Sequence, residues 1–154
     1  MDFLTGEYEI KIDTNRRMMI PGALKKKLPN VENEGLVVNR GFKKYLVIYT
    51  KQEWNKKLEE LSKLNQYEPK NIEFIRYFTR GATELALDSA GRVNIPQPLL
   101  EYAGIKGDVV LTCLINKMEL WDKVAHDALL NAEPEDFSLI AQEVMGDKAK
   151  GGQQ

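Results

Sequence analysis

The sequence predicts an α+β fold in which one β-β-α-β-β unit occurs twice, with helices flanking the two copies. The first observation is an internal repeat: residues 6–24 align with residues 81–99 at a constant offset of 75, and seven of the 19 positions are identical. Unrelated sequences would share about one. The second observation is a period-two alternation of apolar and polar side chains in both copies, which is typical of half-buried strands. The third is a proline after the second strand of each copy, where a first helical turn is expected.

The composition is that of an ordinary folded protein. Of the 154 residues, 43% are hydrophobic and 29% are charged, which excludes a disordered chain. No apolar run approaches the roughly 18 residues that span a bilayer, and the first residues lack a secretion signal, so we expect a cytoplasmic protein without membrane contact. The single cysteine, Cys113, lies in an apolar run. This predicts a buried thiol and excludes an intrachain disulfide.

The charge is distributed unevenly along the chain. The net charge is −1, but residues 1–80 hold 16 Lys and Arg against 11 Asp and Glu. Residues 81–154 hold 6 against 12. This asymmetry favours one face directed at polyanions and another directed at a different partner.

The first copy is predicted element by element. Tyr8, Ile10 and Ile12 alternate with charged residues and mark a strand. Asp13 starts a short polar turn, because its carboxylate can bond to nearby backbone groups. A second strand follows and ends at Pro21, and residues 22–28 read as a short helix. A loop is expected between Leu28 and Gly35, and strands over 35–39 and 45–49 complete the unit.

The second copy repeats this order with stronger turn signals. Thr83, Leu85 and Leu87 alternate along its first strand. Asp88 starts the turn, in which Gly91 can take a positive φ, and Pro96 closes the second strand. Residues 97–103 form the helix, and strands over 108–115 and 117–121 follow.

Further helices flank the units. Thr50 begins a capping box, and Trp54, Leu58 and Leu61 mark one face of the helix after it. Other helices are expected from Pro69 to Gly81, from Asp122 to about Asn131, and after Pro134. The predicted divisions are a first repeat at 5–50, linking helices at 51–80, a second repeat at 81–123, C-terminal helices at 124–146 and a disordered tail at 147–154.

These residues resemble the MraZ family of bacterial transcription regulators. The strongest matches are Asp13-Thr-Asn-Arg-Arg-Met-Met-Ile-Pro21, Arg80-Gly-Ala-Thr-Glu84 and Asp88-Ser-Ala-Gly-Arg-Val-Asn-Ile-Pro96. The resemblance implies two AbrB-like swapped-hairpin units that form a small barrel-like core. It also implies a homo-oligomeric ring, association with the nucleoid, and binding to promoter repeats upstream of an operon of cell-division and cell-wall genes. The family's Asp-x-x-x-Arg loops map onto Asp13 with Arg17, and onto Asp88 with Arg92.

One position departs from the family pattern. Arg16 stands where the first motif usually has Gly, whereas the second motif keeps it as Gly91. If the position needs a positive φ, an arginine there costs about 1 kcal/mol. It also adds a cation to the loop.

Five polar side chains are candidates for contact with double-stranded DNA: Lys11, Asn15, Arg16, Arg17 and Arg92. An arginine can donate two hydrogen bonds to a phosphate or to a guanine edge, and a two-stranded ribbon is narrow enough for the major groove. The alternative is that these charges only keep the hairpins soluble. Arg92 could equally serve a subunit contact or its own Asp88, and Asn15 is also a common turn residue.

The other motif residues are expected to shape the loops. Asp13 and Asp88 would be repelled by DNA, so we predict that they cap the turns or pair with the arginine four residues on. Gly91, Pro21 and Pro96 have backbone roles.

No catalytic residue, metal site, cofactor or small-molecule substrate is predicted. His126 is the only histidine and has no second ligand near it in the sequence, so we expect it to pack or to cap a helix. The leading hypothesis is therefore a sequence-specific DNA-binding transcriptional regulator. The alternatives are an antitoxin-like interaction or scaffold module and a small enzyme whose site forms between subunits.

Overall fold

The computed structural model describes residues 3–131 and 136–146. The chain divides into two compact units, Met1–Lys123 and Val124–Gln154, and each is described by itself. The tail predicted to be disordered, residues 147–154, lies outside the described residues.

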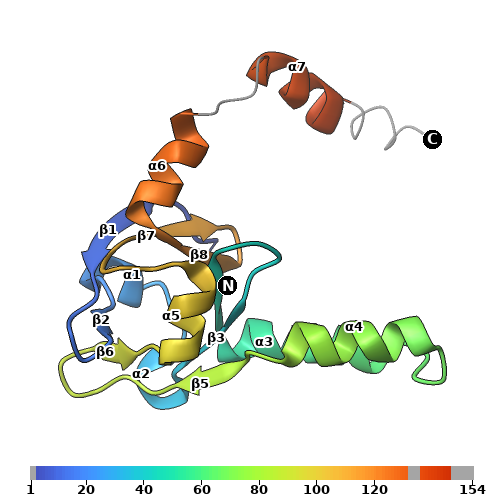
Figure 1. Cartoon of the computed structure of the whole chain (residues 1–154), viewed down its shortest axis with the longest axis horizontal. Coiled ribbons are helices and arrows are strands. Elements are labelled where there is room, and N and C mark those ends of the chain that lie inside the picture. Colours follow the sequence, from blue (N-terminus) through green and yellow to red (C-terminus); the bar gives the residue numbers. More distant parts are fainter. Residues whose placement is uncertain (1–2, 132–135, 147–154) are drawn as a thin grey trace. The chain divides into compact units, whose positions relative to one another are not determined.

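The first unit contains both repeats and the helices between them (Figure 1). Its strands are β1 (Glu7–Lys11), β2 (Arg17–Met19), β3 (Leu36–Arg40), β4 (Leu46–Thr50), β5 (Thr83–Leu85), β6 (Arg92–Asn94), β7 (Asp108–Leu114) and β8 (Lys117–Asp122). Its helices are α1 (Gly22–Lys25), α2 (Val31–Glu34), α3 (Lys51–Ser62), α4 (Pro69–Thr79) and α5 (Gln97–Ala103). The predicted β-β-α-β-β order is confirmed in the second repeat, and the first repeat has the same order with one additional helical turn, α2.

The two repeats share their sheets. Six strands form one antiparallel sheet in the order β1-β7-β8-β4-β3-β5. The first strand of each repeat pairs with the third strand of the other, so that β1 lies beside β7 and β5 lies beside β3. The remaining strands, β2 and β6, pair with each other. Neither repeat therefore completes a sheet without the other.

Of the two buried apolar clusters in the part of the chain that the structure describes, the larger is shared by the two repeats, and the smaller surrounds Trp54. The larger cluster is the core, and its fully buried side chains come from both repeats and include Met18, Leu24, Leu46, Ile95 and Leu111. The cysteine is part of this core, as the apolar run around it predicts: Cys113 is buried, and burial raises the pKa of its thiol. A common core makes the two repeats one folding unit rather than two domains.

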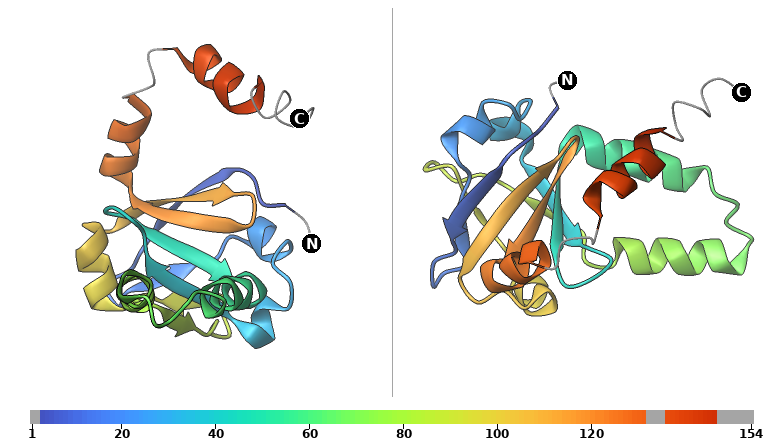
Figure 2. Two further views of the ribbon diagram at one scale, coloured as in Figure 1. Left: turned by 90° about the vertical axis from the view of Figure 1, so that its right-hand side faces the viewer. Right: turned by 90° about the horizontal axis from the view of Figure 1, so that it is seen from above.

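The linking helices extend away from the sheet (Figure 2). The Thr50 side chain accepts a hydrogen bond from the Glu53 backbone N–H at 3.2 Å, which confirms the predicted cap of α3. Trp54 of α3 stacks on Phe78 of α4, with ring centroids 6.0 Å apart. The Asn39 amide, buried at the edge of β3, donates to the Phe78 carbonyl at 2.8 Å. These contacts hold the end of α4 against the sheet.

The repeat is visible in the surface charges as well. Lys51 pairs with Glu84, and Lys123 pairs with Glu9 at 3.0 Å. The two lysines correspond to each other in the two repeats, and so do the two glutamates. Each ion pair thus joins the residue after the fourth strand of one repeat to the first strand of the other repeat.

One predicted loop is partly helical. Asn30 takes a left-handed φ of 52°, and the helical turn α2 follows it before Gly35. The preceding helix, α1, is also shorter than expected: it ends at Lys25, whereas the sequence predicts a helix through residue 28. Asn tolerates the left-handed conformation better than most residues, which allows the chain to start a new helical turn there.

The second unit consists of helical segments. These are α6 (Lys123–Asn131), which begins at the last residue of the first unit, α7 (Phe137–Ala141) and the π-helical turn η1 (Gln142–Gly146). His126 is buried, but α7 and η1 contain no buried residue. None of the helices within residues 3–131 and 136–146 has both the length and the apolar character that crossing a membrane requires.

Candidate nucleic-acid interface

The first Asp-x-x-x-Arg loop is a tight turn closed by its own backbone. The Arg16 N–H donates to the Asp13 carbonyl at 2.9 Å, and the Asp13 N–H donates to the Arg17 carbonyl at 3.0 Å. Arg16 has a φ of 64°. A turn of this kind needs one left-handed residue before the second strand, and Arg16 supplies it.

The Asp13 carboxylate organises this loop. One of its oxygens accepts from the Asn15 and Arg17 backbone N–H groups, both at 2.9 Å. The other accepts from Arg17 Nε at 3.1 Å. Asp13 thus caps the turn and pairs with Arg17, the two structural roles that its spacing predicts.

The second loop has the same set of bonds. Asp88 accepts from the Ala90 and Arg92 backbone N–H groups at 2.9 and 2.8 Å, and from Arg92 Nε at 2.9 Å. Gly91 occupies the left-handed position with a φ of 82°. The two loops are therefore copies of one frame that differ in the residue at its left-handed position.

The hydrogen bonds stabilise the charged form of both carboxylates. The backbone N–H of Arg17 is the main cause that lowers the pKa of Asp13, and the backbone N–H of Arg92 does the same for Asp88. Both groups are exposed, so solvent screens them. They remain ionised at neutral pH and hold the arginine side chains in place.

The two loops lie at opposite ends of the β2–β6 ribbon, because its strands are antiparallel and each loop precedes its own strand. The Ile95 N–H donates to the Arg16 carbonyl at 2.8 Å, and the Ile20 N–H donates to the Gly91 carbonyl at 3.0 Å. The left-handed residue of each loop is thus bonded to the strand of the other repeat. This reciprocal pairing fixes the distance between the loops.

The paired strands have an inner and an outer face. Met18 and Val93 are opposite each other in the register and are fully buried. The residues on either side of them point outward: Arg17 lies opposite Asn94, and Arg92 lies opposite Met19. We call Arg17, Met19, Arg92 and Asn94 the ribbon face. These four residues include two guanidinium groups and no carboxylate. The two carboxylates that bond to the guanidinium groups, Asp13 and Asp88, belong to the adjoining loops.

The ion pairs leave part of each arginine free to act. Arg17 and Arg92 bond to their aspartates through Nε, so the two terminal nitrogens of each guanidinium stay outside that bond. About a third of each side chain is exposed: 34% for Arg17 and 32% for Arg92. A phosphate or a base edge can bond to such terminal nitrogens.

The other predicted contact residues surround the first loop. Lys11 is exposed at the end of β1, Asn15 is exposed in the turn, and Arg16 is half-buried. Lys25 of α1 lies near the second loop, and its Nζ is 3.1 Å from a carboxylate oxygen of Glu32. Sequence reasoning missed Met19 and Asn94, since their place on the ribbon face depends on which strand lies beside β2.

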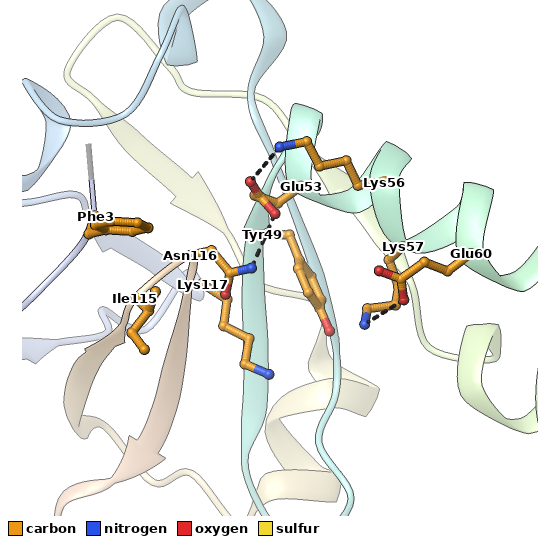
Figure 3. Close-up of a pocket in the computed structure, with 9 residues that line it drawn as sticks. All are labelled: Phe3, Tyr49, Glu53, Lys56, Lys57, Glu60, Ile115, Asn116 and Lys117. Carbon is orange, nitrogen blue, oxygen red and sulfur yellow. Dashed lines mark hydrogen bonds and ion pairs between the residues drawn. The ribbon is translucent and has the colours of Figure 1, made fainter. Parts of the chain in front are cut away.

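A separate cavity of about 390 Å³ lies between α3 and the turn that joins β7 to β8 (Figure 3). Glu53 is buried there and bonds to Lys56 and to the Asn116 amide, both at 3.3 Å. Lys57 and Glu60 form another ion pair at 3.2 Å. These charges pair with each other across the cavity wall, as expected of a structural network.

Among the described residues, no three His, Cys, Asp or Glu side chains are grouped as metal ligands would be. His126 is buried in α6, where the sequence led us to expect packing or capping.

Comparison with known proteins places the chain in a family. The family model described as "MraZ protein, putative antitoxin-like" matches residues 3–76 and again residues 78–147. Three curated relatives are each named "Transcriptional regulator MraZ". The one from Christiangramia forsetii is 40% identical over 144 residues, or 93% of each chain. The one from Flavobacterium psychrophilum is 37% identical over 95% of this chain and 94% of its own. The one from Cytophaga hutchinsonii is 31% identical over 97% and 99%.

Proposed function

This chain belongs to the MraZ family, and from that premise we propose that it is a sequence-specific DNA-binding transcriptional regulator that reads duplex DNA with its Asp-x-x-x-Arg loops. The relatives are named as regulators, not as enzymes, and the family is a non-enzymatic one. The proposed targets are promoter repeats upstream of its own operon of cell-division and cell-wall genes.

The observation that carries the proposal is the ribbon face. Two arginines project from one antiparallel ribbon, and each is oriented by an aspartate that bonds to its Nε. Ribbons of two strands fit the major groove, and oriented guanidinium groups give both charge and direction to a contact. Solvated charges that only confer solubility need no such orientation, which favours the DNA-binding interpretation.

The first loop is the principal contact in this proposal. Arg16 and Arg17 are adjacent there, and Lys11 lies at the end of the strand before it. The second loop has Arg92, with Lys25 of α1 near Gly91, and its own helix α5 has no lysine or arginine. Attraction to phosphates increases with the number of cations, so the first loop contributes more to affinity.

We place the protein in the cytoplasm, associated with the nucleoid, as a homo-oligomeric ring. One chain presents few contacts, so a single subunit would bind weakly. A ring places equivalent loops side by side and gains affinity on repeated sites.

The proposed fold assignment is a duplicated AbrB-like swapped hairpin with a barrel-like core. The exchange of β1 and β5 between the repeats supports it.

Titration of fluorescent duplex DNA from upstream of the reading frame tests the function. We expect Arg17→Ala to lower affinity about tenfold and to reduce the slope of log affinity against log salt by about one. Arg76→Ala, which removes an exposed arginine of α4, is the matched control and should change neither. If Arg17→Ala leaves both the affinity and the salt slope unchanged, Arg17 does not contact DNA.

The second candidate function is an antitoxin-like protein-interaction module. The family's description and the exposed aromatic side chains of α4, Phe74 and Tyr77, favour it. In that case duplex DNA would not compete with the protein partner for binding.

A further inference from the structure

A pocket on the first unit is lined by none of the residues of the ribbon face. It has a volume of about 250 Å³. Its walls come from the end of β3, the turn after it, α4 and α5: Arg40, Phe42, Phe74, Tyr77, Phe78 and Tyr102. We call it the aromatic pocket. Phe42 and Tyr77 are 78% and 64% exposed. Neighbouring aromatic side chains with this much exposure are typical of a surface that binds a partner.

Arg40 is the one charged group in this pocket. Its guanidinium lies over the Tyr77 and Tyr102 rings, at 4.7 and 5.2 Å from their centroids. One terminal nitrogen donates to the Tyr77 carbonyl at 2.9 Å, and so caps the end of α4. Its Nε is buried and has no acceptor among the described residues. A buried donor of a charged group costs free energy until an acceptor reaches it.

The rim of the pocket is positively charged. Residues 40–45 contain Arg40, Lys43 and Lys44 and no acidic residue. Lys43 and Lys44 are both exposed beside Phe42. A suitable ligand is therefore apolar at its centre and negatively charged at its edge.

The C-terminal segment, residues 136–146, has this chemistry. Five large apolar side chains of α7 and η1 are between 40% and 72% exposed: Phe137, Leu139, Ile140, Val144 and Met145. The same segment holds two acidic residues, Asp136 and Glu143, and no Lys or Arg. A short helix with its apolar side exposed needs a surface to cover it.

The carboxylates of this segment differ in what they already bind. Asp136 caps α7, because it accepts from the Leu139 N–H at 3.1 Å and from the Ser138 hydroxyl at 2.6 Å. Glu143 lies beside Val144 in η1 and is exposed. Glu143 is thus the carboxylate that best suits an arginine beneath an apolar contact.

We propose that the aromatic pocket binds the C-terminal segment, residues 136–146, of a second copy of this chain. The inference rests on the homo-oligomer of the proposed function and names its interface. Two aromatic pockets cannot face each other, because Arg40, Lys43 and Lys44 would repel their equivalents. A pocket that binds a different surface of the next copy gives a head-to-tail contact, the type of contact that forms a ring when the rotation between copies closes.

Light scattering and sedimentation of the full chain test the proposal. We expect Phe42→Asp and Phe137→Asp each to raise the dissociation constant of self-association about tenfold or more, since each buries a charge in the contact. The matched controls are Tyr67→Asp, at an aromatic residue 97% exposed outside the pocket, and Val124→Asp, at 77% exposed outside the segment. Both should keep the mass of the unmodified chain.

An equimolar mixture of Phe42→Asp and Phe137→Asp is the decisive measurement. One intact pocket and one intact segment remain between the two chains, so the mixture should form a complex of two chains at a concentration at which neither variant assembles alone. If both variants keep the assembled mass, the interface is elsewhere and only this inference fails. A mixture that stays monomeric contradicts docking between copies. If the unmodified chain is itself monomeric, the ring of the proposed function fails as well, whereas DNA binding by Arg17 is measured independently.

Discussion

The two Asp-x-x-x-Arg loops have the same backbone and different charges. Corresponding hydrogen bonds to Asp13 and to Asp88 agree within 0.2 Å. The left-handed position, however, holds Arg16 in one loop and Gly91 in the other. The helix after the first loop, α1, ends with Lys25, whereas the helix after the second, α5, contains no lysine or arginine.

This difference shows that the hydrogen-bonded backbone of the loop does not depend on the charge that the loop carries. The aspartate and the arginine at the fourth position after it account for all the side-chain hydrogen bonds within each loop. The left-handed position tolerates even an arginine, although at a cost. The frame is therefore kept in both loops while the charge varies.

The largest effect is expected from substitutions in the β2–β6 pair, which both loops share. Met18→Ala should cost about 2 to 5 kcal/mol of unfolding free energy, because Met18 is fully buried in the centre of the β2–β6 pair. Val93→Ala should cost less, since fewer atoms are removed. Urea denaturation measures both. Hydrogen exchange should show that Met18→Ala weakens protection of the Ile20 and Ile95 amides alike; a loss confined to Ile20 would contradict the coupling of the two loops.

Next in size is the difference between the two arginines in DNA binding. Arg17→Ala should lower affinity about tenfold, or roughly 1.4 kcal/mol, and Arg92→Ala should lower it less, since Arg92 has fewer cations around it. Titrations at two salt concentrations measure this difference. Equal losses would mean that the ribbon face binds as a symmetric pair.

A smaller effect comes from exchanging the left-handed residues. Arg16→Gly should raise the unfolding free energy by about 0.5 to 1 kcal/mol, because it relieves the positive φ. Gly91→Ala should lower it by a similar amount, although a Cβ there would meet Lys25 and Met19 only at 3.7 and 3.8 Å. Urea midpoints of the two variants should move in opposite directions. Movement in the same direction would show that space, and not φ, governs these positions.

The smallest effect is the acid dependence of stability. The pKa of Asp13 and that of Asp88 are lowered below 3.8 in the folded chain. Their contribution is present above pH 3.8 and is lost as the pH falls through the lowered folded values. Asp13→Asn and Asp88→Asn should each flatten the decline of stability as the pH falls below 3.8. If the stability of both variants falls with pH as steeply as that of the unmodified chain, these two carboxylates are not the cause of the decline.

The sequence predicts the local structure of these loops well. The offset between the repeats aligns Arg16 with Gly91 in sequence, and that alignment predicts the positive φ of Arg16. The alternation of Tyr8, Ile10 and Ile12 also marks β1 correctly.

The arrangement in space could not be predicted in the same way. Alternation shows that a segment is a strand but does not say which strand lies beside it, so the pairing of β1 with β7 and the ribbon face were missed. The position of Arg40 over two tyrosine rings leaves no periodic signal, because it depends on how α4 and α5 meet β3. The helical turn after Asn30 was predicted as a loop because proline and asparagine are typical of loops.

The exchange of β1 and β5 has a consequence for how such a chain can be divided. A half-length chain with a single repeat would leave its first strand without the third strand that it needs, and could satisfy it only by dimerising. In the full chain, α3 and α4 tether the two halves, so that this encounter is intramolecular and independent of protein concentration. The chain is in effect a covalently linked dimer of its own repeat.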